Sequence, residues 1–142
     1  MTFAPQEIQK TLYTVLSTDS ALQTLLGGGA SDKKVYDRVP QEQTFPFVTI
    51  GEIMNVDRGS HNTEGYSNTI TIHVWDQGLN AGRKQVQTIQ KRIDELLHNQ
   101  EPSISGWDVV CFRRSSSNVL IDPDNITFHG VQIFNLLTGE HI

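Results

Sequence analysis

The sequence contains a single cysteine, Cys111, among its 142 residues. One cysteine excludes an internal disulfide, and a chain of this length can bury a sufficient core without one. The run of about 18 apolar residues that a membrane-spanning helix needs is also absent, so we expect no membrane partner. The first residues lack the positive charge and apolar stretch of a signal peptide, which predicts a protein that stays where it is made.

Positive charge is scarce as well. The sequence has 11 lysines and arginines against 16 aspartates and glutamates, and its formal net charge is -5. This balance opposes non-specific attraction to phosphate groups and argues against a protein that coats duplex nucleic acid. A local basic spot remains compatible with it.

Motifs that carry catalysis or bind metals are missing too. No histidine lies in an H-x-x-x-H pattern, and there is no C-x-x-C or G-x-S-x-G motif. His73 and His129 could meet across neighbouring strands, but two ligands without a third make a weak metal site. The glycines at 27–29 follow a predicted helix and are read as its end, and the acidic cluster at 122–125 is read as a proline turn rather than a calcium loop. We therefore expect no enzyme, no cofactor and no bound metal.

Two regions have the apolar spacing of helices. Residues 5–26 form the first, with a break at residues 17–20, where Asp19 and its neighbours are good helix caps, and an end at Gly27. Residues 81–98 form the second, which Asn80 would cap. Its apolar residues make one stripe that we expect to pack on a sheet, namely Val86, Ile89, Ile93, Leu96 and Leu97.

Five segments have the composition or alternation of strands: residues 35–39, 47–54, 69–75, 107–114 and 128–137. Pro40 marks the first as an edge strand. The polar stretch 55–67 is predicted to be a long loop, and residues 115–117 and 122–125 are predicted turns. The order α-β-β-β-α-β-β predicts a single α+β domain over residues 1–142, with two helices packed on one face of a mainly antiparallel sheet.

Five residues outside the long loop are candidates for contact with a partner. Arg113 and Arg114 end a predicted strand, where they fit either a partner's acidic group or a charged strand end that prevents unwanted pairing. Trp75 and Trp107 lie in predicted strands, and either could be an interface anchor or a core residue. Arg38 lies in the predicted edge strand 35–39.

Residues 35–52, VYDRVPQEQTFPFVTIGE, resemble a family of phage tail-completion proteins, in which a Tyr-Asp/Arg-x-x-Pro turn precedes an aromatic-Pro strand. Further features match in the same order: a leading amphipathic helix that ends on DSAL at 19–22, the strand TIHVWD at 71–76, a helix after Gly82, and HGVQIF at 129–134. The resemblance therefore covers nearly the whole chain. These are tail-terminator, or head-to-tail joining, proteins of long-tailed bacteriophages.

The resemblance implies a structural protein of the virion without a substrate. It implies a homo-oligomeric ring, usually a hexamer, on the head-proximal end of the tail tube, assembled in the host cytoplasm. Its partners would be other copies of itself, the major tail-tube protein and a head-completion or connector protein, with DNA passing through the ring without specific binding. Residues that could contact neighbours or the tube are Arg38, Asp57, Arg58, His61, Glu64, Trp75, Arg113 and Arg114.

Two other functions remain open from the sequence. One is a different neck protein, such as a head-completion stopper or a connector subunit. The other is a small hydrolase or ligand-binding domain, which would need a deep pocket that gathers polar groups, for example His73, His129 and a carboxylate.

Overall fold

A computed structural model describes residues 2–29, 32–41, 43–78 and 82–141. Along the chain these residues form α1 (Ala4–Thr18), α2 (Ser20–Leu26), β1 (Val35–Tyr36), β2 (Phe47–Asp57), β3 (Gly65–Gln77), α3 (Arg83–Leu97), β4 (Trp107–Ile121) and β5 (Thr127–Glu140). The α+β class is confirmed, and the predicted first helical region is two helices. Within the described ranges, no helix is long and apolar enough to cross a membrane.

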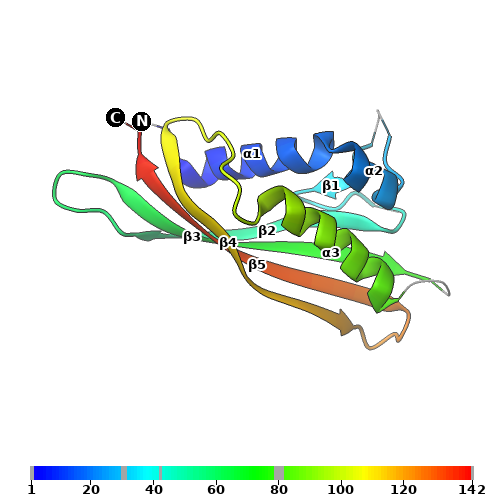
Figure 1. Ribbon diagram of the computed structural model, residues 1–142. Helices are drawn as coiled ribbons and strands as arrows, with labels where there is room; N and C mark the ends of the chain where they lie inside the picture. The colour runs from blue at the N-terminus through cyan, green and yellow to red at the C-terminus, as the bar shows by residue number, and fades with distance from the viewer. Residues whose placement is uncertain (1, 30–31, 42, 79–81, 142) are drawn as a thin grey trace.

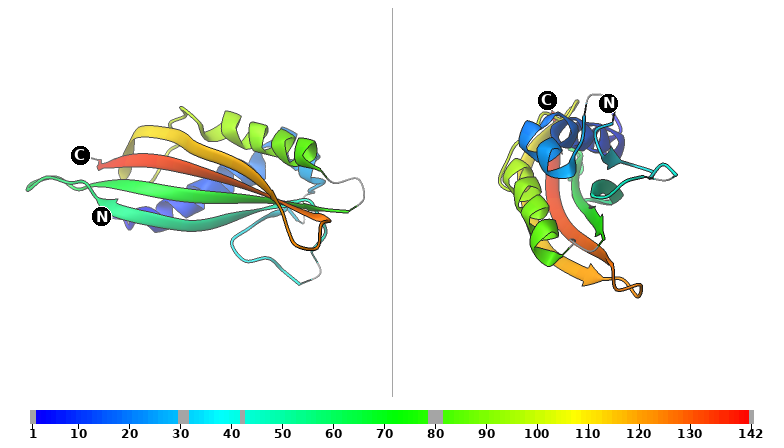
Figure 2. Two further views of the ribbon diagram at one scale, coloured as in Figure 1. Left: turned by 90° about the horizontal axis from the view of Figure 1, so that it is seen from below. Right: turned by 90° about the vertical axis from the view of Figure 1, so that its right-hand side faces the viewer.

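The strands form one sheet in the order β1-β2-β3-β5-β4. β1 pairs with β2 in parallel, and every other neighbouring pair is antiparallel. β1 lies at one end of the sheet, as predicted, and β4 lies at the other. All three helices lie on the same face of this twisted sheet (Figures 1 and 2).

Local signals divide the N-terminal helices where the sequence predicts. A proline lies in the first turn of α1, where its missing amide costs no hydrogen bond. Asp19 caps α2, because its carboxylate accepts a hydrogen bond from the Leu22 amide at 2.8 Å. Gly27 ends α2 in the left-handed conformation, with a φ of 70°. The same Asp19 carboxylate binds the Arg92 guanidinium at 2.6 and 2.8 Å, which holds its pKa below the usual value and joins α2 to α3.

The core lies between the helices and the sheet. The apolar stripe of α3 is confirmed, with Val86, Ile89, Ile93 and Leu97 buried and Leu96 packed at its margin. The helix begins at Arg83 after Gly82, and the predicted cap Asn80 lies outside the described residues. From the other elements, the fully buried side chains that pack against this stripe include Ile8, Leu12, Leu16, Leu22, Leu26, Ile70, Ile72, Val74, Phe134 and Leu136.

α3 crosses β5 at close range above Gly130. A Cβ atom at this glycine would lie 2.6 Å from Val86 Cγ1 and 2.6 Å from Gln90 Nε2. The Gln90 amide group uses this space to reach β4, where it donates a hydrogen bond to the Asn118 carbonyl at 3.1 Å. Gln132 in turn donates to the Gln90 carbonyl at 3.0 Å. Glycine at position 130 therefore makes room for a buried polar connection between α3 and the sheet.

Three predicted boundaries are wrong, and each error concerns a strand. Residues 55–67 are not one long loop, because β2 continues to Asp57 and β3 begins at Gly65, which leaves only residues 58–64 as the connection. Residues 115–117 are not a turn but lie inside β4, next to a bulge that absorbs one extra residue. The first strand has only two residues, Val35–Tyr36, instead of five. In the first two cases polar residues continue a strand because the neighbouring strand supplies backbone partners.

Candidate functional site

The face of the sheet opposite the helices is open: no helix or strand of the described part of the chain packs on it (Figure 2). Cross-strand partners identify the side chains on this face, since opposed residues point to the same side. The face mixes apolar and polar side chains, and two of its apolar side chains are strongly exposed, Met54 at 62% and Leu120 at 48%. It is formed by Phe47, Thr49, Met54, Val56, Ser67, Thr69, Thr71, His73, Trp75, His129, Val131, Ile133, Asn135, Leu137, Cys111, Arg113, Ser116, Asn118 and Leu120.

Three aromatic rings stack at one end of this open face. The Trp75 indole lies parallel to the His129 imidazole, with centroids 3.7 Å apart and 8° between the planes. His73 Nδ1 and His129 Nε2 are 2.7 Å apart in a hydrogen bond, which confirms the predicted meeting of the two histidines. The Trp75 indole donates a hydrogen bond to Thr49 Oγ1 at 3.3 Å. Gly51 leaves room for the stack, because a Cβ there would lie 2.9 Å from His73 Nε2.

The two tryptophans therefore have different surroundings. Trp107 is a core residue with 4% of its surface exposed, and its ring meets Tyr66 edge to face. Trp75 is half-buried and faces the open side of the sheet. Of the two alternatives that the sequence left open, the core position applies to Trp107, and only Trp75 lies where a partner can reach it.

Burial lowers the pKa of both histidines below the ordinary value, because a charged imidazole loses hydration there. A charge on His73 lowers the pKa of His129 further. Two acidic groups oppose these shifts, Glu52 for His73 and Asp122 for His129. Near neutral pH both imidazoles are therefore uncharged, and the N–H group of one ring donates the hydrogen bond to the bare nitrogen of the other.

This pair predicts a loss of stability in mild acid. The folded pKa values lie below the unfolded value of about 6.5, so the unfolded chain binds more protons as the pH falls. The free energy of unfolding should then fall as the pH drops through 6.5, and a His129→Gln variant should lose part of that fall. Urea unfolding at pH 7.5 and 5.5 measures it. His61→Gln, in an exposed loop, is the matched control, and equal pH dependence in all three proteins would contradict the prediction.

The ends of β2 and β3 form a hairpin arm, residues 55–67, that projects past the helices (Figure 1). Its tip, residues 58–64, contains three of the predicted contact residues, and Asp57 precedes it. All four side chains are exposed, as expected for residues that contact a partner. The tip is ordered by hydrogen bonds, among them Arg58 amide to Gly65 carbonyl at 2.7 Å and Tyr66 hydroxyl to the Glu64 carboxylate at 2.8 Å. The arm thus holds Asp57, Arg58, His61 and Glu64 together.

The three other predicted contact residues lie apart from the arm. Arg38 is exposed between β1 and β2. Arg113 donates a hydrogen bond to Asn99 Oδ1 at 2.9 Å, and Arg114 pairs with the Asp94 carboxylate at 3.0 Å. The two β4 arginines therefore bind the end of α3, and the structure does not gather all eight predicted residues at one place.

Sequence reasoning missed most of the open face. Met54 lay at the end of a predicted strand and Val56 in a predicted loop, while Leu120 followed a predicted turn. The available signal was alternation, because Met54 and Val56 lie two residues apart and share a face. That signal was weak beside the polar residues that follow.

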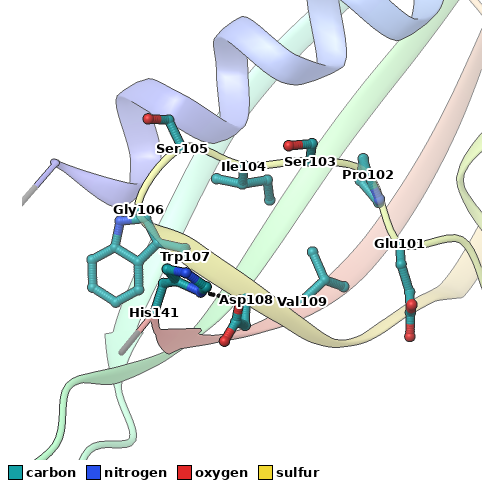
Figure 3. A pocket seen from close by; sticks show the side chains of 10 residues that line it. All are labelled: Glu101, Pro102, Ser103, Ile104, Ser105, Gly106, Trp107, Asp108, Val109 and His141. Atoms are coloured by element: carbon teal, nitrogen blue, oxygen red, sulfur yellow. Dashed lines mark hydrogen bonds and ion pairs between the residues drawn. The ribbon is translucent and has the colours of Figure 1, made fainter.

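The hollows on the surface are shallow grooves. One lies beside the segment that leads into β4, where His141 Nδ1 and Asp108 Oδ1 are 2.8 Å apart (Figure 3). Another runs between the start of α1 and β2 and includes Phe3, Asp37 and Glu52. Neither contains His73 or His129. Within the described ranges, no group of three or more histidine, cysteine, aspartate or glutamate side chains could hold a metal ion.

Comparison with known proteins identifies the family. A family model described as "Tail completion protein gp17" matches residues 10–139. The chain belongs to the tail completion protein gp17 family. The resemblance found in the sequence is thereby confirmed, and the protein is a structural, non-enzymatic component of the virion tail.

Two known proteins are similar to this tail completion protein. The tail completion protein gp17 of Bacillus phage SPP1 is 25% identical over 91 residues, which are 64% of this chain and 66% of that protein, just short of two thirds. A chain in the solved structure "Virion of native gene transfer agent (GTA) particle" has the same fold, with a TM-score of 0.83 at 18% identity. That likeness covers 97% of this chain and 99% of the other.

Proposed function

We propose that this tail completion protein forms a ring on the head-proximal end of the tail tube, where it stops tail elongation and provides the surface that joins the head. The family match over residues 10–139 carries the proposal. The SPP1 relative is named for completing a tail. A tail is complete when its tube stops growing and becomes ready for the head, so a cap at the growing end fits that name.

The surface of the chain suits self-association. A ring needs two different surfaces on each copy that fit one another, since a head-to-tail contact closes when the rotation between copies allows it. The chain offers an open sheet face with exposed apolar side chains, a projecting arm and a sheet that ends in two different strands. We propose a hexamer in which residues 1–142 act as one domain.

The arm is the proposed contact with the tube or with a neighbouring copy. Asp57, Arg58, His61 and Glu64 present both signs of charge at its exposed tip, which suits ion pairs across an interface. Trp75 would add a rigid aromatic surface on the open face. Arg38, Arg113 and Arg114 lie nearer the two ends of the sheet, where neighbouring copies would meet.

The other proposed partners are the major tail-tube protein and a head-completion or connector protein. DNA would pass through the ring without specific binding, because the net charge of -5 gives no general attraction to phosphate. The ring would be built in the host cytoplasm and remain at the head-proximal end of the virion tail.

Omitting the protein tests the proposal. Tails assembled without it should have unregulated lengths and should not join heads, and adding the purified protein should restore one length class. Electron microscopy of negatively stained tails measures both. Tails of normal length without the protein would contradict the terminator role. Binding to filled heads in preference to tail ends would instead favour the alternative neck function, a stopper or connector subunit.

A further inference from the structure

The two ends of the sheet carry strand edges that are only partly covered. β1 pairs with β2 at Val48 and Thr49 alone, and from residue 50 to 57 the outer edge of β2 has no backbone partner among the described residues. On β4 the Arg114 amide donates to His98 Nδ1 at 2.9 Å, and the Phe112 carbonyl accepts from the Asn99 amide at 2.7 Å. Beyond this cover, residues 115–121 have no partner on their outer side in the described structure.

Hairpin closure shows which backbone groups point outward. The Arg58 amide donates to the Gly65 carbonyl, so residues 54, 56 and 58 face β3, while Ile53, Asn55 and Asp57 face away from it. The Asp122 amide donates to the Thr127 carbonyl at 2.9 Å, so residues 118, 120 and 122 face β5. Residues 117, 119 and 121 therefore present their amides and carbonyls outward on β4.

Both free edges carry few of the charges and prolines that usually protect an edge strand against pairing. Edge strands in soluble proteins are commonly short or carry charges and prolines. β4 has 15 residues, and its free stretch 115–121, SSSNVLI, has no charged residue, proline or glycine. On β2, Glu52 is the single charge between residues 50 and 56. The groove between α1 and β2 lies along this edge and leaves space beside Ile50 and Ile53.

We propose that β4 of one copy pairs with β2 of the next copy, so that the sheet continues from subunit to subunit. This inference rests on the proposed ring and specifies its contact. Rotation about an axis along the strands preserves strand direction, and within one sheet β2 and β4 run in opposite directions. The new pairing is therefore antiparallel, the more stable of the two kinds.

The outward groups and the two faces limit the register to shifts of two residues. Outward residues must oppose outward residues, and opposed side chains share a face. Among these registers, the proposed one places Val119 opposite Ile53, since both already pack at the margin of the core. Ser117 opposes Asn55 on the same face. Asn118 opposes Met54 on the open face, where the partner's Asn118 backbone covers part of the exposed methionine.

This register is staggered. Within one copy Met54 is level with Arg113, through Thr69 and Asn135, whereas Asn118 is level with Thr49. Pairing Asn118 with Met54 shifts the next copy along the strands by four residues, which is about 13 Å. Across the sheet, the four inter-strand spacings of one subunit add up to about 19 Å. Strands would then tilt by about 35°, a value found in closed sheets. An arrangement without this shift is blocked. His98 and Asn99 already occupy the edge of β4 at residues 112–114, and β1 occupies the edge of β2 at residues 48 and 49.

Cysteine cross-linking tests the register. In a Cys111→Ser background, Met54→Cys and Asn118→Cys should form a disulfide between copies, since opposed residues without mutual hydrogen bonds have Cα atoms about 4.5 Å apart. The two positions lie three strands apart within one chain, so no internal bond can form. Met54→Cys with Arg113→Cys, the level pair, is the matched control. Oxidised tails carrying the first pair should give a reducible ladder of covalent oligomers on denaturing gels, and the control should remain monomeric.

A backbone test accompanies the cysteines. Ser117→Pro removes an outward amide and leaves the ladder to β5 intact, so it should fold and reduce tail-length regulation at least tenfold in titration, whereas Ser117→Ala should act like the wild type. Normal regulation by Ser117→Pro, or a ladder from the control pair only, overturns the edge pairing while the terminator role stands. If the wild-type protein itself does not regulate tail length, the proposed function fails and this inference fails with it.

Discussion

Gly130→Val is expected to destabilise the fold by about 3 kcal/mol, at the upper end of the cost of overfilling a packed core. The first added atom would overlap both Val86 and Gln90, which lie 2.6 Å from its position. Neither can move freely, since Val86 is buried in the α3 stripe and Gln90 donates to the Asn118 carbonyl. The helix must lift from β5 or the buried hydrogen bond must break. Urea unfolding measures the loss as a lower midpoint.

Gly139 supplies the matched control on the same strand. A Cβ atom there would meet only Val110 Cγ2, at an ordinary distance of 3.9 Å. Gly139→Ala should therefore change stability by less than about 1 kcal/mol, and it can be stabilising because alanine reduces the freedom of the unfolded chain. Gly130→Ala should lie between the two. Equal stability of Gly130→Ala and Gly139→Ala would show that α3 does not lie as close to β5 as described.

Shortening the arm is expected to abolish tail-length regulation without unfolding the domain. Replacing residues 59–64 by Asn-Gly joins Arg58 to Gly65 through a two-residue turn that suits the twist of paired strands. The ladder between β2 and β3 is kept, and no residue of the core is removed. Stability should change by less than about 1 kcal/mol, because loop length has a small effect on folding entropy. Electron microscopy of tails assembled with the variant should show unregulated lengths.

A variant of unchanged length separates reach from charge. Asp57→Asn, Arg58→Gln, His61→Gln and Glu64→Gln together keep the arm and remove its ionisable groups. If the arm acts through ion pairs, this variant should regulate tails poorly and become less sensitive to salt than the wild type. If it acts through reach alone, regulation should be normal. Normal regulation by the shortened arm would remove the arm from the proposed contact.

The helices could be predicted from the sequence because their signals are local. Asp19 caps α2 through an amide three residues away, and Gly27 ends it by its own backbone freedom. The stripe of α3 likewise lies within one helix. Strand ends have no such local signal. Asn68 has its whole side chain buried in β3 and donates to the Leu136 carbonyl at 3.0 Å, a partner 68 residues further along the chain.

The candidate contact surfaces were also predictable only where their signals are local. The charged residues of the arm were found because polar residues between two apolar segments are exposed in any plausible fold. The meeting of His73 and His129 followed from alternation in two strands. The open face was not found, because its exposure depends on all three helices packing on the other side. The cover on the edge of β4 could not be predicted for the same reason, since His98 and Asn99 reach this strand only in the folded chain.

The cover that His98 and Asn99 provide on β4 bears on the solubility of the free protein. It interrupts the edge of this 15-residue strand at residues 112–114, which separates the uncharged stretch 115–121 from the rest of the strand. Uncharged segments of six or seven residues without proline or glycine are the kind that stack into amyloid-like fibrils. On β4, a subunit in solution carries this hazard at residues 115–121, next to Arg113 and Arg114. Aggregation of the free protein at high concentration is therefore expected to begin at this stretch of β4.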